Sequence, residues 1–398
     1  MALVPTHGLL CVTPVVGYNL QNVIKLQNAV QEDDVDFGLF LMPLHPPERP
    51  VADTYDEDLQ TLMVADELGY REAWIGEHFT SGWENIPCPD LLIAKAAGRT
   101  RQIRFGTGVT LMPFHQPVEV ALRAATLDQL TRGRFMLGVG SGGIGLDRKA
   151  FGIELSAADA AELTREGIEA VVKVWSGEPI VHHGKFFNID LSSPDDRLKI
   201  GLALRPYQQP HPPIAIAGVS RASAGLSLAG EHGWIPMSTN FVPPDALHLH
   251  WEAVEKGAAR TGRTAMRREW RIAREIYVAD SHEEAFRDAR EGAMARSFSE
   301  YMLPLVASGA AGLQAFMPDN QQLPNEAITI EYLLNNIWIV GTPDECAAKL
   351  QSLYDQVGGF GSVLMIGHDW YPDTAKWFRS LELFASKVMP RLAGSVPG

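Results

Sequence analysis

Apolar positions between residues 71 and 145 form three short continuous runs that alternate with two segments of helical spacing. The runs are residues 72–77, 104–112 and 135–143, and the segments of helical spacing are residues 89–100 and 117–133. A strand without polar alternation is buried on both faces, which is typical of parallel sheets that carry helices outside. This stretch therefore predicts consecutive βα units around a parallel sheet.

The same alternation extends over most of the chain. Five more strands are predicted at residues 35–43, 213–220, 234–239, 270–280 and 362–369. Further helices are predicted at residues 56–68, 156–175, 221–230, 243–261, 282–296, 342–358 and 374–388. Eight strands, each followed by a helix, predict a TIM (β/α)8 barrel with insertions over residues 35–392. An open doubly wound sheet is the alternative, but no GxGxxG fingerprint lies on an early strand-to-helix turn, and the GVGSGG after the fourth strand is only loosely similar.

Three segments depart from the repeat. Residues 1–34 are expected to form an N-terminal extension that decorates the surface or packs on a partner subunit. Residues 180–190 alternate around a central glycine and predict a β-hairpin insertion. Residues 297–330 are rich in Gly, Pro and Gln and are predicted to be an irregular lid or binding loop, because so long a loop in a compact domain is usually functional.

Composition removes several classes of function. The 398 residues carry a formal net charge of -14, which disfavours nucleic acid and anionic membrane surfaces as partners. No apolar run approaches the roughly 20 residues that a membrane span needs. The three cysteines are far apart and odd in number, so neither a disulfide framework nor a zinc site is expected, and a cytoplasmic protein is favoured. His182 and His183 alone make no metal site, and no metal is predicted.

Polar side chains follow the predicted strands at their carboxyl ends. Glu77 and His78 end the second strand, Thr110 lies in the third and Ser141 in the fourth. Because ligands of βα folds bind at this edge, His78 is a candidate acid, base or hydrogen-bond donor. A structural histidine is the competing interpretation.

A second set of strand-end residues carries weaker signals. His368 and Asp369 end the last strand and are minor candidates for a ligand contact. Aromatic residues also fall at strand ends, where they either close the core or line a pocket for an apolar substrate. They are Phe79, Trp83, Trp234, Phe241, Trp370 and Tyr371.

Two loops have the composition of a phosphate or cofactor site. Five glycines crowd residues 138–145, where they allow backbone N–H groups to approach a ligand closely. Ser220, Arg221 and Ser223 lie where the fifth strand turns into its helix, and a helix N-terminus with hydroxyl groups favours a phosphate. Alternatively, Ser220 only caps the helix.

Five segments of the sequence, in their order along the chain, together resemble a known family. AWIGEHFTSGWENIPCPDLLIA, RFGTGVTLMPFHQPVEVA, LDQLTRGRFMLGVGSG, HHGKFF and PIAIAGVS occur here in the order found in the bacterial luciferase-like monooxygenase superfamily. The WENIPCPDLL segment is most similar to its limonene-monooxygenase-like group. The resemblance covers roughly residues 35–392 and implies a TIM barrel that binds FMN, reduced by a separate flavin reductase.

The resemblance also assigns roles near the flavin ring. His78 matches the first histidine of the family's Glu-His-His motif, which implies a catalytic role, whereas Phe79 replaces the second histidine. Gly108 and Val109 match the site of a non-prolyl cis peptide beneath the isoalloxazine ring.

The phosphate end is assigned in the same way. Ala217, Gly218, Val219 and Ser220 match the family's FMN phosphate loop, with Arg221 and Ser223 as further contacts. Ser141 stands where luciferase has an arginine, so that contact is absent here, and Arg221 is the candidate replacement. Gly142, next to Ser141, completes the predicted cofactor-binding set.

The resemblance implies a monooxygenase that uses reduced FMN and dioxygen, through a flavin peroxide, to oxygenate a small apolar substrate. Terpene epoxidation, oxygen insertion into a ketone and aldehyde oxidation stay open. A deazaflavin-dependent oxidoreductase of the same superfamily is the alternative, and a non-catalytic flavin-binding protein is a third hypothesis. A homodimer is also expected, because residues 89–100 and 117–133 are apolar on more than one helical face.

Overall fold

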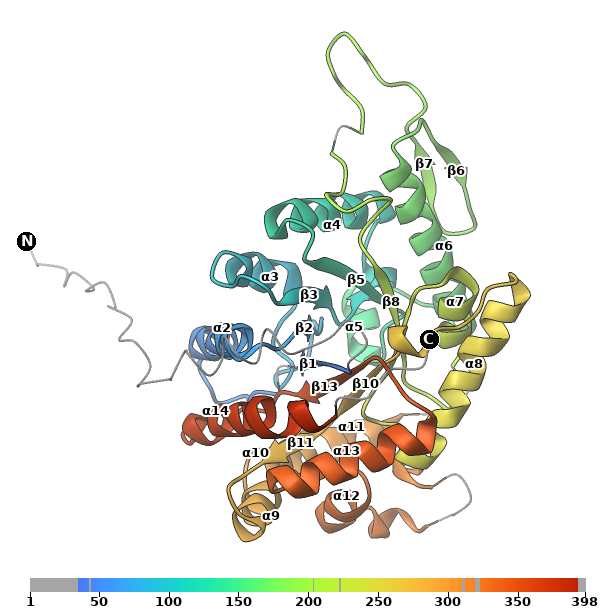
Figure 1. Ribbon diagram of the computed structural model, residues 1–398. Helices are drawn as coiled ribbons and strands as arrows, with labels where there is room; N and C mark the ends of the chain where they lie inside the picture. The colour runs from blue at the N-terminus through green and yellow to red at the C-terminus, as the bar shows by residue number, and fades with distance from the viewer. Residues whose placement is uncertain are drawn as a thin grey trace, which may run out of the picture.

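The structure is a computed structural model in which strands form a closed barrel surrounded by helices (Figure 1). It describes residues 35–42, 44–202, 204–221, 223–309, 312–318 and 323–392. The predicted extension at residues 1–34 lies outside the described residues.

Eight strands lie parallel to one another in the barrel, one within each predicted strand segment. They are β1 (Asp36–Leu41), β2 (Glu72–Ile75), β3 (Arg104–Thr107), β5 (Phe135–Gly140), β8 (Ile214–Gly218), β9 (Ile235–Ser238), β10 (Arg271–Arg274) and β13 (Ser362–Ile366). The order β3-β2-β1-β13-β10-β9-β8-β5 is closed because β3 also pairs with β5. The TIM barrel is therefore confirmed, and the open sheet is not formed.

The predicted helices surround the barrel, with boundaries set by local signals. They are α2 (Val51–Leu68), α3 (Pro89–Ala97), α4 (Pro117–Thr131), α6 (Ala157–Ser176), α7 (Ala224–His232), α8 (Leu247–Arg260), α13 (Pro343–Val357) and α14 (Thr374–Leu383). Thr342 and Glu345 form a capping box at the start of α13, and Gly358 ends that helix at φ 74°. Local capping chemistry therefore defines both ends of α13.

The barrel interior is filled around one indole. Trp74 is fully buried, and a methyl group built on Gly106 would lie 2.1 Å from its ring. At the amino ends of the strands, the buried Arg271 forms an ion pair with Glu72 at 3.2 Å. A close-packed interior of this kind leaves ligand binding to the barrel ends.

Three expected elements are interrupted. The strand predicted at residues 104–112 is divided into β3 and the short β4 (Thr110–Leu111). The single strand predicted at residues 270–280 is wrong: after β10 the chain leaves the barrel at Glu275, and β11 (Ile276–Val278) pairs outside it with β12 (Ile339–Gly341). The helix predicted at residues 282–296 breaks at Gly292 into α9 (His282–Glu291) and α10 (Ala293–Ser297).

The segment predicted to be irregular, residues 297–330, is largely helical in its described part. A π-helical turn (Phe298–Met302) continues α10 and leads into α11 (Leu303–Ser308), and 3-10 turns follow at Gly312–Phe316 and Asn325–Ala327. Pro304 suggests a loop in the sequence, but it lies inside a continuous helical stretch, directly after the π-helical turn, where the α-helical hydrogen-bonding pattern is already interrupted. A helix, α12 (Ile330–Asn336), then precedes β12.

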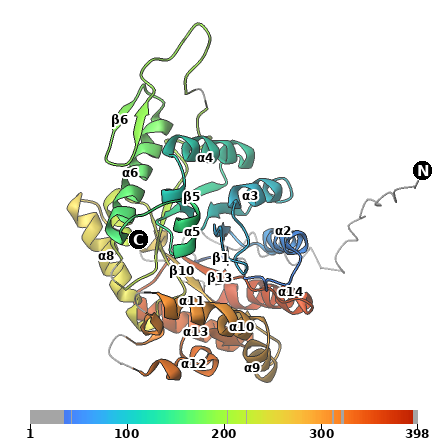
Figure 2. The same ribbon diagram turned by 180° about the vertical axis from the view of Figure 1, so that it is seen from behind.

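The predicted hairpin is confirmed. β6 (Val181–His183) and β7 (Asn188–Asp190) pair in antiparallel fashion and project from the barrel beside α6 (Figure 2). Among the helices that the structure describes, none combines the length and hydropathy needed to cross a bilayer.

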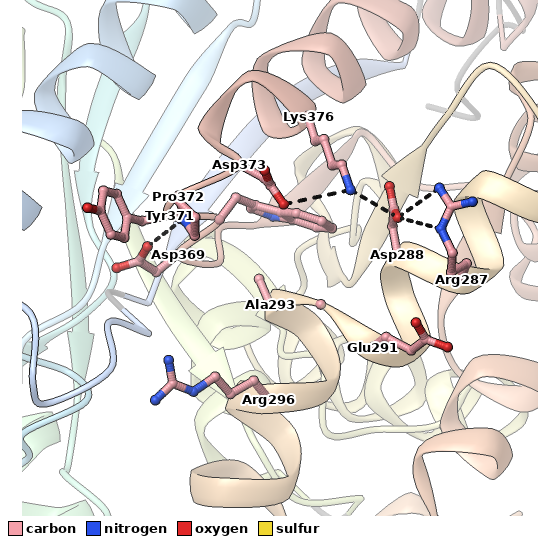
Figure 3. Close-up of a pocket in the computed structure, with 12 residues that line it drawn as sticks. Arg287, Asp288, Glu291, Ala293, Arg296, Asp369, Tyr371, Pro372, Asp373 and Lys376 are labelled. Carbon is pink, nitrogen blue, oxygen red and sulfur yellow. Dashed lines mark hydrogen bonds and ion pairs between the residues drawn. The ribbon is translucent and has the colours of Figure 1, made fainter.

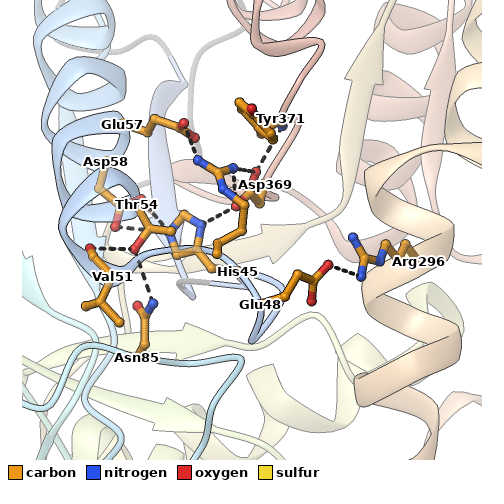
Figure 4. A network of polar contacts seen from close by, with 11 residues as sticks. His45, Glu48, Val51, Thr54, Glu57, Asp58, Asn85, Arg296, Asp369 and Tyr371 are labelled. Carbon is orange, nitrogen blue, oxygen red and sulfur yellow. Dashed lines mark hydrogen bonds and ion pairs between the residues drawn. The ribbon is translucent and has the colours of Figure 1, made fainter.

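His45, Arg49, Asp58 and Asp369 form a polar cluster that we call the His45 clasp (Figure 4). It joins the loop after β1, helix α2 and the loop after β13 at the carboxyl ends of the strands. Nδ1 of the buried His45 lies 2.7 Å from Asp369, and Nε2 lies 3.3 Å from Asp58 on α2. Arg49 also donates to Asp369, at 2.7 Å. Burial alone would lower the pKa of His45, but hydrogen bonds to Asp369 and Asp58 and their negative charge raise it to about 9.

Because of the His45 clasp, we expect part of the free energy of unfolding to depend on pH. A histidine whose pKa is raised by folding stabilises the protein below its unfolded pKa of about 6.5 and loses that contribution as pH rises through about 9. Between pH 6 and pH 10, wild type should therefore lose on the order of 3 kcal/mol more unfolding free energy than His45→Gln. Urea denaturation of both proteins at each pH measures this difference, and a pH-independent difference would contradict the assignment.

Candidate functional site

The carboxyl ends of the eight strands form one mouth of the barrel, where the predicted site residues lie. The peptide bond between Gly108 and Val109 is cis, as expected, and β4 (Thr110–Leu111) follows it and pairs with β5. A methyl group on Gly140, at the end of β5, would lie 2.5 Å from the Val109 side chain. The absence of a side chain at Gly140 is therefore what admits Val109 here.

His78 lies two residues beyond Gly76, just after β2, with 19% of its side chain exposed. Its Nε2 atom is 3.3 Å from a carboxylate oxygen of Glu84. Its Nδ1 atom is buried and has no hydrogen-bond partner among the described residues. Because buried ring nitrogens are normally hydrogen-bonded, Nδ1 is a candidate contact for a bound molecule.

Glu77, next to His78, has a structural role. Its buried carboxylate accepts a hydrogen bond from the backbone N–H of Leu111 at 2.6 Å and contacts His115 Nε2 at 3.0 Å. It therefore fixes the backbone that follows the cis peptide.

Phe79, the expected replacement of a histidine, belongs to an aromatic cluster. Its ring centroid lies 5.1 Å from that of Phe114 and 4.7 Å from that of Phe151. An imidazole at position 79 would place a polar group among these rings. The replacement therefore gives an apolar surface beside His78.

The expected phosphate loop runs from the end of β8 to the start of α7. Ser223, not Ser220, is the N-cap of α7, since its hydroxyl accepts a hydrogen bond from Leu226 N at 3.2 Å. Val219 and Ser220 are exposed, whereas Gly218 is buried and Ala217 half-buried. The structure therefore does not support the alternative in which Ser220 only caps the helix.

A chain of buried groups, which sequence reasoning did not find, supports the expected phosphate loop from behind. Trp270 Nε1 donates to Ser238 Oγ at 2.9 Å, and Ser238 Oγ contacts His250 Nδ1 at 2.8 Å. His250 Nε2 lies 2.8 Å from the Ser220 carbonyl oxygen. Burial lowers the pKa of His250 to about 4. The ring is thus neutral, with one nitrogen accepting from Ser238 and the other donating to Ser220.

The remaining predicted cofactor contacts lie on both sides of the mouth. Arg148 donates to the carbonyl oxygen of Gly142 at 3.1 Å and lies 3.4 Å from that of Ser141. Arg221 donates to the carbonyl oxygen of Met317 and lies 3.4 Å from that of Gln314. The Arg221 guanidinium therefore reaches toward the segment between β10 and β13.

His368 is buried at the end of β13, and burial lowers its pKa to about 3, which keeps the ring neutral. Its Nδ1 contacts Ser297 Oγ at 2.9 Å, and its Nε2 has no hydrogen-bond partner in the described part of the chain. Asp369, its neighbour, is used in the His45 clasp. Of this pair, only His368 has a group left for a ligand.

A separate cavity of about 380 Å³ lies between α9, α10 and the loop before α14 (Figure 3). Several of its charged groups pair with one another: Asp288 contacts Lys376 at 3.1 Å and Arg287 at 3.2 Å. None of the residues predicted to bind the cofactor lines it. A self-neutralised polar wall of this kind does not suit an apolar substrate.

Comparison with known proteins places this barrel in a family. The family model described as luciferase-like monooxygenase matches residues 35–359. The 4-hydroxyprotoasukamycin monooxygenase of Streptomyces nodosus subsp. asukaensis is 37% identical over 92% of this chain and 94% of its own length. Limonene 1,2-monooxygenase of Rhodococcus erythropolis is 31% identical, over 91% of this chain and 88% of its own length.

A solved structure is similar over the same region. The oxygenating constituent of 3,6-diketocamphane monooxygenase from Pseudomonas putida, a type II Baeyer-Villiger monooxygenase in complex with FMN, superimposes with a TM-score of 0.80. The two chains are 32% identical, and the match covers 90% of this chain and 98% of that one. With its barrel, its cis Gly108–Val109 peptide and these matches, the chain belongs to the luciferase-like monooxygenase family.

Proposed function

We infer that this protein is a flavin-dependent monooxygenase that uses reduced FMN and dioxygen to oxygenate a small apolar molecule. The observation that carries this inference is the 32% identity, over 90% of the chain, to an oxygenating constituent whose structure contains FMN. The relatives named above act on protoasukamycin-type, diketocamphane and limonene substrates, as their names state.

The described residues fit the phosphate of FMN. The exposed Ser220 hydroxyl and the N-terminal backbone amides of α7 offer donors at the positive end of a helix dipole. Ser223 accepts the capping bond, and a hydroxyl that accepts one hydrogen bond can still donate another. The neutral His250, which is hydrogen-bonded to the Ser220 carbonyl, keeps this loop in place.

The opposite side of the mouth fits the flavin ring. We propose that Gly108 and Val109 lie beneath the ring, with Ser141 and Gly142 at its edge, and that the buried Nδ1 of His78 contacts it. The unpartnered state of Nδ1 among the described residues supports this placement, because a bound cofactor would complete its hydrogen bonding.

When bound, reduced FMN supplies the electrons that activate dioxygen. The chain then has three tasks. The Phe79, Phe114 and Phe151 cluster excludes water from the reacting side and offers an apolar surface to the substrate. His78 offers its buried Nδ1 as a hydrogen-bonding group on the reacting side of the site. The α7 N-terminus holds the phosphate and so fixes the cofactor's position.

We also propose that a separate flavin reductase supplies the reduced FMN, as the description "oxygenating constituent" indicates for the similar protein. A cytoplasmic location agrees with Cys88 and Cys346, which are free thiols in the structure.

A homodimer is supported by an apolar groove between α3 and α4. The groove has a volume of about 680 Å³. Leu91 on α3 is 68% exposed and Leu130 on α4 is 60% exposed, so both leucines present most of their surface on this face. We propose that a second copy of the chain covers it, because large exposed apolar patches mark interaction surfaces.

The function is tested by oxygen isotope transfer. The protein is supplied with FMN, NADH and a flavin reductase under ¹⁸O2, and bicyclic terpene ketones and limonene are offered as substrates. We expect a product that carries one ¹⁸O atom.

His78→Ala should keep FMN affinity within about threefold while the product formed per dioxygen consumed falls at least tenfold, in line with acid–base contributions.

Two results would overturn this function. One is substrate oxidation that proceeds without dioxygen when a deazaflavin is the acceptor, which indicates an oxidoreductase of that kind. The other is tight flavin binding with no product from any member of the panel, which indicates a flavin-binding protein.

The phosphate assignment is tested at Ser220. Loss of one charge-assisted hydrogen bond costs roughly 1.4 kcal/mol, so Ser220→Ala should bind reduced FMN about tenfold more weakly. Riboflavin lacks the phosphate and should bind both proteins alike. Ser281→Ala, which removes the N-cap of α9, is the matched control and should leave both affinities unchanged. Equal losses for FMN and riboflavin would remove Ser220 from the phosphate site.

The dimer is tested by charge substitution in the groove. Light scattering of wild type should give about twice the 43.7 kDa mass of one chain. Leu91→Glu combined with Leu130→Glu should give the mass of one chain, because two buried carboxylates oppose association. Leu198→Glu is the control, since Leu198 is 56% exposed and does not line the groove, so its change should leave the dimer intact. A wild-type mass of one chain would refute the proposal.

A further inference from the structure

His78 lies on a loop that is held beneath a helical insertion. We call residues 78–86 the histidine loop and residues 293–308, which comprise α10, the π-helical turn and α11, the capping segment. The loop is fastened on its other side by α5 (Gly145–Ala150), where Asp147 accepts hydrogen bonds from Thr80 N at 2.9 Å and Thr80 Oγ1 at 2.5 Å. The capping segment is therefore positioned to act on His78 through this loop.

Glu84, in the histidine loop, is completely buried although it carries a carboxylate. Its backbone forms an isolated antiparallel bridge with Leu44, and its N–H donates to Ser81 Oγ at 3.0 Å. One carboxylate oxygen, Oε2, accepts a hydrogen bond from the Tyr301 hydroxyl. The other, Oε1, lies 3.3 Å from His78 Nε2.

Among the described residues, neither Oε1 of Glu84 nor Nδ1 of His78 has a partner with hydrogen-bond geometry. A buried carboxylate oxygen requires a donor, and the imidazole Nε2 at 3.3 Å is an ion-pair partner within reach. If Nε2 carries the proton toward Glu84, then Nδ1 is the nitrogen that remains for the cofactor side.

Tyr301 extends this chain into the capping segment. Its hydroxyl accepts a hydrogen bond from Ser81 Oγ at 2.9 Å, and its ring stacks on Trp83 with centroids 5.9 Å apart. Burial and the negative charge of Glu84 raise the pKa of Tyr301 well above its ordinary value, so the hydroxyl keeps its proton. The direction of donation is therefore fixed from Ser81 to Tyr301 to Glu84.

The capping segment is fastened to its surroundings by further contacts. Arg296 lies over the Trp83 ring at 5.8 Å and forms an ion pair with Glu48 at 2.5 Å. Ser297 contacts His368 at 2.9 Å. Tyr301 thus belongs to a segment that touches the loops after β1, β2 and β13.

We propose that Glu84 and Tyr301 are positioning residues that hold the His78 imidazole with its proton on Nε2 and its Nδ1 toward the cofactor. Because Tyr301 belongs to the capping segment and donates to Glu84, the orientation of the imidazole depends on the position of that segment. The proposal rests on the proposed function for the role of His78 in chemistry, but the contact that it describes can be measured without flavin.

The experiment determines which ring nitrogen of His78 carries the proton. Protein labelled with ¹⁵N-histidine, free of flavin, is studied by long-range ¹H–¹⁵N correlation above the ordinary titration range of imidazole, and the His78 signal is assigned by its loss in His78→Ala. Wild type should show the proton on Nε2. In Glu84→Gln, Tyr301 still donates to the amide oxygen, so the NH2 group faces His78 and the proton should move to Nδ1.

Two tyrosine variants complete the test. Tyr301→Phe should give a mixture of both tautomers, because Glu84 then lacks its second partner. Tyr332→Phe is the matched control, since the Tyr332 hydroxyl donates to the Phe316 carbonyl at 3.0 Å in the same inserted region and should leave the His78 tautomer unchanged.

The outcomes separate this inference from the proposed function. An unchanged His78 tautomer in Glu84→Gln overturns the inference, whatever the enzyme does. A changed tautomer with product coupling lowered about tenfold in FMN-loaded protein supports both proposals. A changed tautomer with unaltered coupling supports the positioning contact and removes His78 from the chemistry.

Discussion

The pairing of β3 with β5 closes the barrel, and the remaining structure depends on that closure. Phe105 lies opposite Phe135 and Gly106 opposite Met136 in this pairing. The two strands can meet only if the barrel centre accommodates Trp74, and the missing side chain at Gly106 makes that possible. Once the barrel is closed, eight strand ends open on one mouth, and loops far apart in sequence must share it.

The shared mouth explains why buried polar contacts, rather than loop sequence, position the site. Asp147 holds Thr80, neutral His250 holds the Ser220 carbonyl, and Glu77 holds the backbone after the cis peptide. Each contact joins two different βα units. These contacts favour the observed loop conformations, because releasing a loop would leave a buried polar group without a partner.

The serine beside the start of α7 has a local signature, and its binding of phosphate stays a prediction. The strands could be predicted from the sequence because burial on both faces gives each a continuous apolar run. The pairing of Tyr301 with Glu84 could not, since the two are 217 positions apart in the chain and neither lies in a recognised motif. The break at Glu275 was also missed, because a strand that leaves one sheet for another keeps its apolar pattern. Sequence patterns thus reveal periodic burial and local motifs but not long-range polar partners.

The two ends of the candidate site are held by different parts of the molecule. The phosphate loop is backed by Ser238, His250 and Trp270, which belong to the barrel and its α8 helix. His78 is instead held through Glu84 by Tyr301, which lies in the insertion between β10 and β13. Changes in the insertion can therefore alter the environment of His78 while the barrel residues continue to support the loop at Ser220. In the proposed function, binding of the phosphate and reactivity at the ring would depend on separate sets of contacts, so that one cofactor site could serve different substrates.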